Sequence, residues 1–336
     1  MKLSINIISI YCLLFLFTGC STNKVTNTEL IVLPKAQQDA YLSRSKPAKY
    51  FGYSVFGQPN GAVGLKGEAR LHPNHKAIAG MINNMPLIPI SGRNQSFKSF
   101  AILDTGSPIS WMEFKYAQDL NADFLAYRER NIPYQGIYNI GEVDAYAAVV
   151  HQLRIDQLFI ENIPLYVKMA IGSLGPQARG IKNPPLSSVI GYDILKLFSI
   201  VQFDFDAGII RLASTQTYTP NEALLVGSSS IIDKEGLGLV VEGSIFGEST
   251  PVVLDFAGNY HLTTPNAMYP FTRQLSIGDL VFRKVPTERF DNIPRVGNKL
   301  FSDLIVTICP KEKIVYFERS RSVSYTHLTL PTIMPV

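Results

Sequence analysis

The sequence predicts an all-β fold made of two homologous lobes, with few and short helices. The chain has 336 residues, of which 46% are hydrophobic and 17% charged, so it is long enough to bury a large core. From Pro86 onward, short apolar or alternating runs are separated by Gly, Asn and Pro, a pattern typical of strands joined by turns. The clearest strands are expected at residues 87–90, 100–103, 145–153, 165–167 and 200–205. Helices are expected only at residues 112–120, 192–198 and 299–304.

A sequence duplication runs through this β-rich region. Three blocks recur in the same order: residues 101–104 and 252–255, residues 155–164 and 277–286, and residues 190–212 and 296–317. Any single block is an ordinary strand pattern, but the shared order of all three indicates two copies of one unit. We call these the first copy and the second copy.

The first copy is longer than the second. Its extra piece, residues 112–150, contains the segment 131–141 (NIPYQGIYNIG), which places turn residues between strand formers. This pattern predicts a hairpin flap that only the first copy supplies. Tyr134 and Tyr138 are the candidate flap tyrosines, although tyrosines on strands are also commonly structural.

Both ends of the chain are expected to lie outside the fold. Met1 and Lys2 precede an apolar stretch, residues 3–17, with the charge and length of a secretory signal. Residues 18–20 (TGC) resemble the lipobox of bacterial lipoproteins, the alternative being a plain signal peptide with an incidental cysteine. The resemblance implies a lipid anchor on Cys20 that attaches the protein to the bacterial cell envelope, in Gram-negative bacteria the outer membrane with the domain facing the periplasm. The expected organisation is a signal peptide at 1–19, a tether and lead-in at 20–85, an N-terminal lobe with the flap at 86–218, a shorter C-terminal lobe at 219–318 and a non-native tail at 319–336.

Cysteine usage and charge narrow the classes of partner. Cys12 lies in the signal and Cys20 is the lipidation candidate, so Cys309 alone remains and no disulfide is expected in the mature chain. No Cys/His cluster has metal-ligand spacing, and His72 and His75 fit an exposed turn better than a metal site. The formal charge of +4 is carried partly by the chain ends, and the near-neutral body predicts no nucleic-acid partner.

One motif carries chemistry. Asp104, Thr105, Gly106 and Ser107 directly follow an apolar run, and Gly191 ends a later apolar run. Together they resemble the pepsin and retropepsin superfamily of aspartic peptidases, closest to its bacterial retropepsin-like branch, over roughly residues 86–317. The resemblance implies a bilobal acid-protease β-barrel fold with few short helices. It also implies a catalytic carboxylate at Asp104, a water nucleophile and no metal or organic cofactor.

The chemistry of such a site needs two carboxylates that face one another. A carboxylate at the end of a buried strand is partly desolvated, and two of them share one proton, so that one acts as base and the other as acid on a common water. Asp255 is the expected partner of Asp104. The family resemblance further implies that Thr105 bonds across the lobe interface, that Gly106 allows close backbone approach, and that the Ser107 hydroxyl bonds the outer oxygen of Asp104.

The second copy departs from the family pattern around its aspartate. After Asp255 come Phe256, Ala257, Gly258 and Asn259, where the family has Thr or Ser, then Gly, then Ser, Thr or Ala. Phe256 has no hydroxyl for the reciprocal bond across the interface. We expect Gly258 to allow a shifted loop and Asn259 to donate to the carboxylate in place of the missing hydroxyl. The packing glycines behind the two loops are expected to be Gly191 and Gly297.

Three functional hypotheses follow. The first is a monomeric aspartic endopeptidase that cleaves peptide or protein substrates in the bacterial envelope, with Asp104 and Asp255 as the dyad. The second is a catalytically inactive lipoprotein that binds peptides in the same cleft. The third is an active homodimer whose dyad consists of Asp104 from each of two chains.

Overall fold

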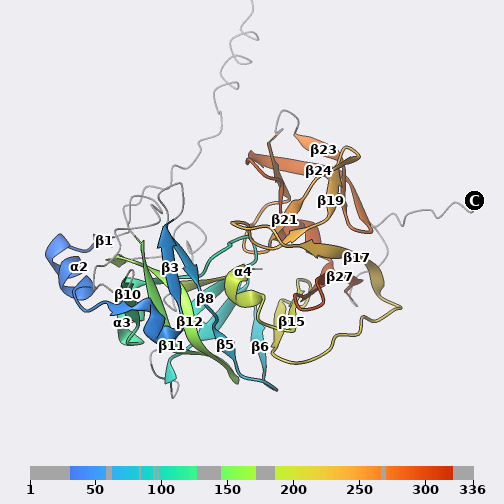
Figure 1. Ribbon diagram of the computed structural model, residues 1–336. Coiled ribbons are helices and arrows are strands. Elements are labelled where there is room, and N and C mark those ends of the chain that lie inside the picture. The colour runs from blue at the N-terminus through green and yellow to red at the C-terminus, as the bar shows by residue number, and fades with distance from the viewer. Residues whose placement is uncertain are drawn as a thin grey trace, which may run out of the picture.

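The computed structural model describes residues 31–57, 63–82, 85–93, 96, 98–126, 145–171, 186–265 and 270–320. Strands make up 53% and helices 11% of the structure, which confirms the expected all-β class. Two large mixed sheets, of nine and fourteen strands, contain most of the strands described. Figure 1 shows the blue and green strands of the first copy on one side and the orange strands of the second copy on the other.

The segment before the first copy holds short elements. They are β1 (Ile31–Val32), α2 (Lys35–Leu42), β2 (Lys46–Pro47), η1 (Ala48–Phe51), β3 (Ser54–Gly57), β4 (Val63–Lys66), β5 (Arg70–Leu71) and β6 (Lys76–Gly80). The first copy and its flanking strands follow. They are β7 (Leu87–Ile90), β8 (Ser99–Asp104), β9 (Trp111–Glu113), α3 (Phe114–Asp119), β10 (Asp123–Ala126), β11 (Ala145–Ile155), β12 (Leu158–Lys168), β13 (Ala170–Ile171), β14 (Leu186–Gly191), α4 (Tyr192–Leu195), β15 (Ile200–Asp204) and β16 (Ile209–Ala213).

The second copy follows the same sequence of elements with fewer insertions. Its elements are β17 (Leu225–Ile232), β18 (Val240–Val241), β19 (Gly243–Ile245), β20 (Glu248–Ser249), β21 (Val252–Asp255), β22 (Leu262–Thr264), β23 (Phe271–Ile277), β24 (Leu280–Phe290), β25 (Arg295–Gly297), η4 (Asn298–Phe301), β26 (Leu304–Cys309) and β27 (Ile314–Arg319).

The two copies have the same strand pairing. In the first, β14 pairs parallel with β8 and antiparallel with β9, while β9 pairs parallel with β12. In the second, β25 pairs parallel with β21 and antiparallel with β22, while β22 pairs parallel with β24. The hairpin β11–β12 corresponds to the hairpin β23–β24. The sequence duplication is therefore also a duplication of structure.

The copies meet in a run of six antiparallel strands within the larger sheet. Its order is β6, β16, β15, β26, β27 and β17, with β15 and β26 paired at the centre. The first copy contributes β15 and β16 to this run, and the second copy contributes β26 and β27. The strands β6 and β17 lie at the two ends of the run, in equivalent positions. A buried hydrophobic cluster extends through both copies, which ties them into one packed unit.

The expected helices are present but shorter than predicted. The helix expected at 112–120 begins at Phe114, because the three residues from Trp111 form β9 between β12 and β14. The other two reduce to a single turn each, at α4 and η4. The lead-in before Pro86 contributes strands to both large sheets: β2 and β5 join the nine-stranded sheet, and β6 joins the larger one.

Candidate active site

The two aspartates end equivalent strands. Asp104 is the last residue of β8 and lies opposite Gly191 on β14, while Asp255 is the last residue of β21 and lies opposite Gly297 on β25. Parallel pairing in the same register gives both carboxylates the same position relative to their own copy. The backbone thus supplies two equivalent sites that face each other across the interface between the copies.

The two packing glycines are required by close backbone contacts. A Cβ atom on Gly191 would lie 2.4 Å from the carbonyl oxygen of Ile109, and one on Gly297 would lie 2.4 Å from that of Tyr260. Since Cβ atoms do not approach a carbonyl oxygen so closely, only glycine fits at either position. Both glycines lie behind the aspartate loops, as the sequence predicted.

The loops after the aspartates align residue for residue, without the shift expected for the second copy. The backbone N–H of Tyr192 donates to the carbonyl of Ser107 at 2.8 Å, and that of Asn298 donates to the carbonyl of Gly258 at 2.9 Å. Ser107 and Gly258 are each three residues after their aspartate. Gly258 therefore occupies the serine position of an unshifted loop.

Thr105 bonds across the interface, as the resemblance implied. Its hydroxyl donates to the carbonyl of Leu254 at 2.7 Å and accepts from the backbone N–H of Phe256 at 3.0 Å. Thr105 is fully buried, so both bonds form in a site from which water is excluded. The Thr105 carbonyl also accepts from the N–H of Leu239 at 2.7 Å. One threonine thus holds the two aspartate loops together from one side.

In the second copy, the residue equivalent to Thr105 is Phe256, which makes different contacts. Phe256 is fully buried, and its ring packs edge-to-face against Phe203 at 4.9 Å and against Phe205 and Phe301 at 5.3 Å between ring centres. Such edge-to-face pairs are favourable beyond the area they bury. The second loop is therefore anchored by an aromatic cluster where the first is anchored by hydrogen bonds.

Close approach of the loops depends on Gly106. A Cβ atom at this position would lie 2.7 Å from both Cβ and Cγ of Asp255 and 3.0 Å from its Oδ1. The side chain of Asp255 thus packs directly against the backbone that follows Asp104. This contact brings the two predicted catalytic residues of a single chain together.

Asp104 is held by backbone groups of its own loop. Its Oδ1 accepts from the N–H groups of Gly106 and Ser107, each at 3.0 Å. The expected bond from the Ser107 hydroxyl is not formed; that hydroxyl donates to the carbonyl of Ile109 at 2.8 Å instead. The prediction for Ser107 was therefore wrong about the group that contacts the carboxylate, because its side chain closes the turn that follows.

Asp255 is held by a residue that the sequence analysis did not identify. The Tyr260 hydroxyl donates to Oδ2 of Asp255 at 2.5 Å, and the backbone N–H groups of Ala257 and Gly258 also favour the charged carboxylate. Asn259, expected to donate here, is exposed, so that prediction was wrong. Tyr260, two residues after Gly258, reaches the carboxylate because its ring folds back over the loop.

A cation from the second copy joins the site. Arg295, on β25, donates from Nη1 to the carbonyl of Gly106 at 3.0 Å, and its Nε lies 2.9 Å from Oδ2 of Asp291. Its charge favours ionisation of both Asp104 and Asp255. The sequence held one signal of this role, since Arg295 is a charged residue two places before the repeated glycine, where the first copy has Val189.

The environment makes the carboxylates weaker acids than usual. Burial raises the pKa of Asp104, and the charge of the adjacent Asp255 raises it further, against the opposing effect of Arg295 and two backbone N–H groups. Burial also raises the pKa of Asp255, against the effects of Tyr260, Arg295 and the backbone N–H groups. Two adjacent buried carboxyls, of which the charge of one raises the pKa of the other, form the kind of pair that shares a single proton.

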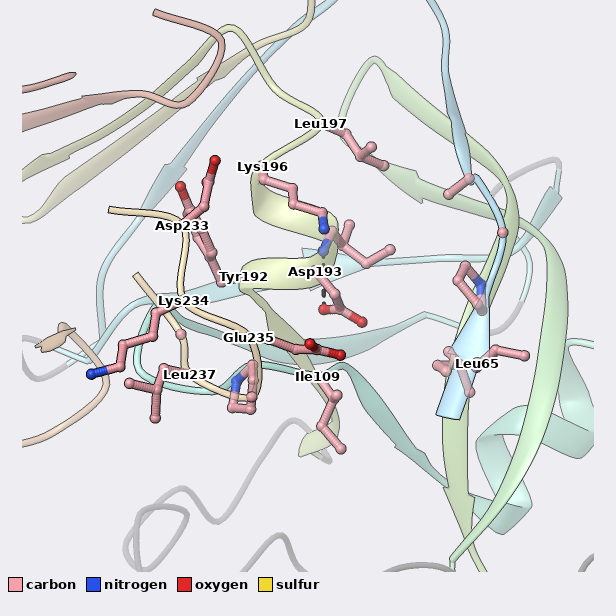
Figure 2. Close-up of a pocket in the computed structure, with 18 of the residues that line it drawn as sticks. Leu65, Ile109, Tyr192, Asp193, Lys196, Leu197, Asp233, Lys234, Glu235 and Leu237 are labelled. Carbon is pink, nitrogen blue, oxygen red and sulfur yellow. Dashed lines mark hydrogen bonds between the residues drawn. The ribbon is translucent and has the colours of Figure 1, made fainter. Parts of the chain in front are cut away.

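A pocket of about 890 Å³ lies beside this site. Figure 2 shows Tyr192 and Asp193 of α4, and Lys196 directly after it, facing a loop of the second copy that carries Asp233 and Glu235. The pocket also reaches the two residues that follow Ser107 and the region of β4. Neither aspartate of the pair lines it, so the pocket flanks the site without containing it.

Several predicted features lie outside the described residues. These are Tyr134 and Tyr138, the signal peptide with Cys20, and residues 321–336 of the predicted tail. The predicted start of the tail at Arg319 was wrong, because Arg319 is the last residue of β27 and pairs with Leu304. The strands on either side of the predicted flap are described: β10 and β11 pair antiparallel, with Phe124 opposite Ala148. The flap between these two strands stays a prediction.

Two searches of the described residues bear on metals and membranes. No group of three or more His, Cys, Asp and Glu side chains is placed to hold a metal ion in the part of the chain that the structure describes. None of the described helices has both the length and the apolar character needed to cross a bilayer.

No family model matches the chain, and no curated protein matches its sequence.

Proposed function

We propose that this protein is an aspartic endopeptidase of the pepsin and retropepsin type, in which Asp104 and Asp255 activate a water molecule to hydrolyse peptide bonds. The observation that carries the proposal is the paired arrangement of the two aspartates. Each ends an equivalent strand opposite a packing glycine, and the backbone after one contacts the side chain of the other. The duplicated topology and the six-stranded junction support the bilobal fold that this class requires.

The chemistry follows from the shared proton. The ionised carboxylate takes a proton from the water as it attacks the peptide carbonyl, while the protonated carboxyl donates to the carbonyl oxygen. The tetrahedral intermediate then collapses when a proton is passed to the leaving nitrogen. Burial of both carboxyls, and the charge of Asp255 beside Asp104, favour one proton on the pair at mildly acidic pH, which this division of roles needs.

The surroundings support an extended substrate held at the cell envelope. The predicted flap of the first copy would cover a peptide lying over the dyad, and the pocket beside Ile109 offers room for substrate side chains. The lipid anchor proposed at Cys20 would attach the enzyme to the bacterial envelope and restrict it to substrates there.

The inactive peptide-binding alternative is favoured by the altered loop of the second copy. Phe256 cannot return the hydrogen bond that Thr105 makes, and Ala257 replaces the expected glycine. Against it, Asp255 keeps both its strand position and hydrogen bonds to its carboxylate. The homodimer alternative has less support, because Asp255 already occupies the place beside Gly106 that a second Asp104 would need.

The test is cleavage of internally quenched peptides by the detergent-solubilised full chain. Asp104→Asn and Asp255→Asn should each lower kcat by about 10³-fold, since each removes one half of the acid–base pair. Asp156→Asn is the matched control: this aspartate lies in an exposed turn with φ of 51°, which asparagine also adopts, and full activity is expected.

The outcomes separate the three hypotheses. An active wild type and two inactive variants, with a specific rate that does not change on dilution, support the intramolecular dyad. Activity that survives Asp255→Asn but falls on dilution supports the homodimer. Peptide binding without turnover by the wild type supports the inactive alternative.

A further inference from the structure

The second aspartate loop contains a hydrogen bond for which the first loop has no counterpart. Tyr260 lies five residues after Asp255, at the position that Ile109 takes after Asp104. The Tyr260 side chain is buried, and its hydroxyl donates to Oδ2 of Asp255 at 2.5 Å. Ile109 has no donor to offer Asp104. The two carboxylates are therefore held by different chemistry.

The loop is shaped to admit this ring. A Cβ atom on Gly258 would lie 2.3 Å from Cε1 and 2.7 Å from Cζ of Tyr260, and 2.9 Å from Oδ2 of Asp255. A Cβ atom on Gly297 would lie 2.9 Å from Cδ2 of the same ring. The ring thus fills the space left by two missing side chains, which directs its hydroxyl to the carboxylate. Gly258 replaces the expected hydroxyl-bearing residue because the tyrosine needs this space.

The bond also gives the two carboxylate oxygens of Asp255 different surroundings. Oδ2 accepts from Tyr260, whereas Oδ1 is buried and has no hydrogen-bond partner among the described residues. Oδ1 is the oxygen that approaches Gly106, on the side of the first copy. A buried acceptor without a donor is costly unless a proton, water or substrate meets it. The free oxygen is thus directed toward the place where the dyad must bind its water.

The charged and titratable groups facing Asp255 mostly favour its ionised form. Tyr260 donates from the loop, Arg295 approaches from β25, and backbone N–H groups of the loop add to them. Asp104 faces Asp255 from the first copy, and the charge of Asp255 raises the pKa of Asp104. Asp291 neutralises part of the charge of Arg295 at 2.9 Å. Among these groups, Tyr260 is the side chain that donates a hydrogen bond directly to the Asp255 carboxylate.

We infer that Tyr260 is a positioning residue that holds Asp255 as the ionised, water-activating member of the dyad and leaves the shared proton to Asp104. This inference rests on the proposed peptidase function. Tyr260 takes over, from a different position in the loop, the role of the hydroxyl group that the second motif lacks. A donor to the carboxylate favours its charged form, so removing that donor raises the pH at which Asp255 becomes a base.

The test compares the pH profiles of wild type and Tyr260→Phe, which removes only the hydroxyl. The acidic limb of the kcat/KM profile should move upward by about one to two pH units, the size expected for losing a hydrogen bond to a charged group. Gly258→Ala should move the limb in the same direction, because its methyl group displaces the ring. KM should change little for either variant.

Tyr218→Phe is the matched control. Tyr218 also donates to a carboxylate, that of Glu318, but it does so at the sheet between the copies and away from the dyad. If the effect of Tyr260→Phe were only structural, both variants would lower the Tm and neither would move the acidic limb. The inference requires that, of these two tyrosine variants, Tyr260→Phe moves the acidic limb and Tyr218→Phe does not.

A second measurement separates failure of the inference from failure of the peptidase proposal. The ¹³C shift of the Asp255 carboxyl, assigned through Asp255→Asn, reports its titration whether or not the protein cleaves peptides. An upward move of this titration in Tyr260→Phe supports the inference, while no move or a downward move overturns it. Absence of cleavage by a wild type that shows this titration would instead reject the peptidase proposal.

Discussion

The two aspartate loops share a backbone but differ in nearly every side chain that surrounds the carboxylate. After Asp104, a threonine bonds across the interface and a glycine admits the opposite aspartate. After Asp255, Phe256 anchors the loop in an aromatic cluster and Tyr260 holds the carboxylate. The difference teaches that the strand register and the packing glycine position each aspartate, while the supporting contacts can be rebuilt from other residues.

The largest effect on the stability of the fold is expected from replacing Phe256, the residue that anchors the second loop. Phe256→Thr restores the residue that the family pattern expects, yet it should destabilise the fold by about 3 to 5 kcal/mol, as a cavity opens where the ring packed. Thr105→Val, which removes two buried hydrogen bonds from the first loop, should cost about 1 to 3 kcal/mol. Urea unfolding measures both. A stable and more active Phe256→Thr protein would show that the aromatic anchor is dispensable.

The next largest effect is expected from substitutions of the small residues in the two loops, Gly106 and Ala257. Gly106→Ala places a methyl group 2.7 Å from Cβ of Asp255, so the carboxylates must separate, and kcat should fall by about 10²-fold. The reciprocal change, Ala257→Gly, removes a methyl that packs with Ile102 and Val189 and should cost only about 1 kcal/mol of stability with kcat nearly unchanged. Steady-state kinetics of the two variants test this asymmetry. Equal losses in both would mean that the loops approach each other symmetrically.

The helical turns behind the two loops, α4 and η4, are expected to differ in how they change the stability of the fold with pH. Asp193 on α4 accepts from the Ser110 N–H and hydroxyl, and that hydroxyl accepts from the Gly191 N–H at 2.9 Å; the second copy has Lys299 at the equivalent place. Burial raises the pKa of Asp193 from 3.8 to about 6, so the folded state holds the proton more tightly than the unfolded chain. This contribution to stability is full below about pH 4 and is lost as the pH rises to about 6, at about 1.4 kcal/mol per pH unit.

Asp193→Asn removes the carboxyl group whose titration lowers the stability of the fold as the pH rises. The free energy of unfolding, measured in urea from pH 4 to pH 7, should fall less steeply with rising pH in the variant than in the wild type. The control is Asp156→Asn, whose carboxylate is exposed and whose slope should match that of the wild type. Parallel curves for wild type and Asp193→Asn would mean that Asp193 titrates in the folded state as it does in the unfolded chain.

The sequence predicted the scaffold of the site better than its contacts. Asp104, Asp255 and the two packing glycines were identified by a repeat in which each aspartate and each glycine holds the same place. The partners of the carboxylates were predicted less well. Ser107 turns its hydroxyl away, Asn259 is exposed, and Tyr260 and Arg295 had not been identified.

The reason lies in the range of the interactions involved. Alternation of apolar and polar residues is local, and a repeated pattern of strands gives a repeated register, so the sequence alone determined an all-β chain with a duplicated pair of aspartate strands. Which side chain reaches a carboxylate depends on gaps between segments that are distant in the chain. The contact of Thr105 with Leu254, the space behind Tyr260 and the reach of Arg295 to Gly106 are such contacts. Only the tertiary structure decided them, because packing selects among donors that the local sequence leaves equivalent.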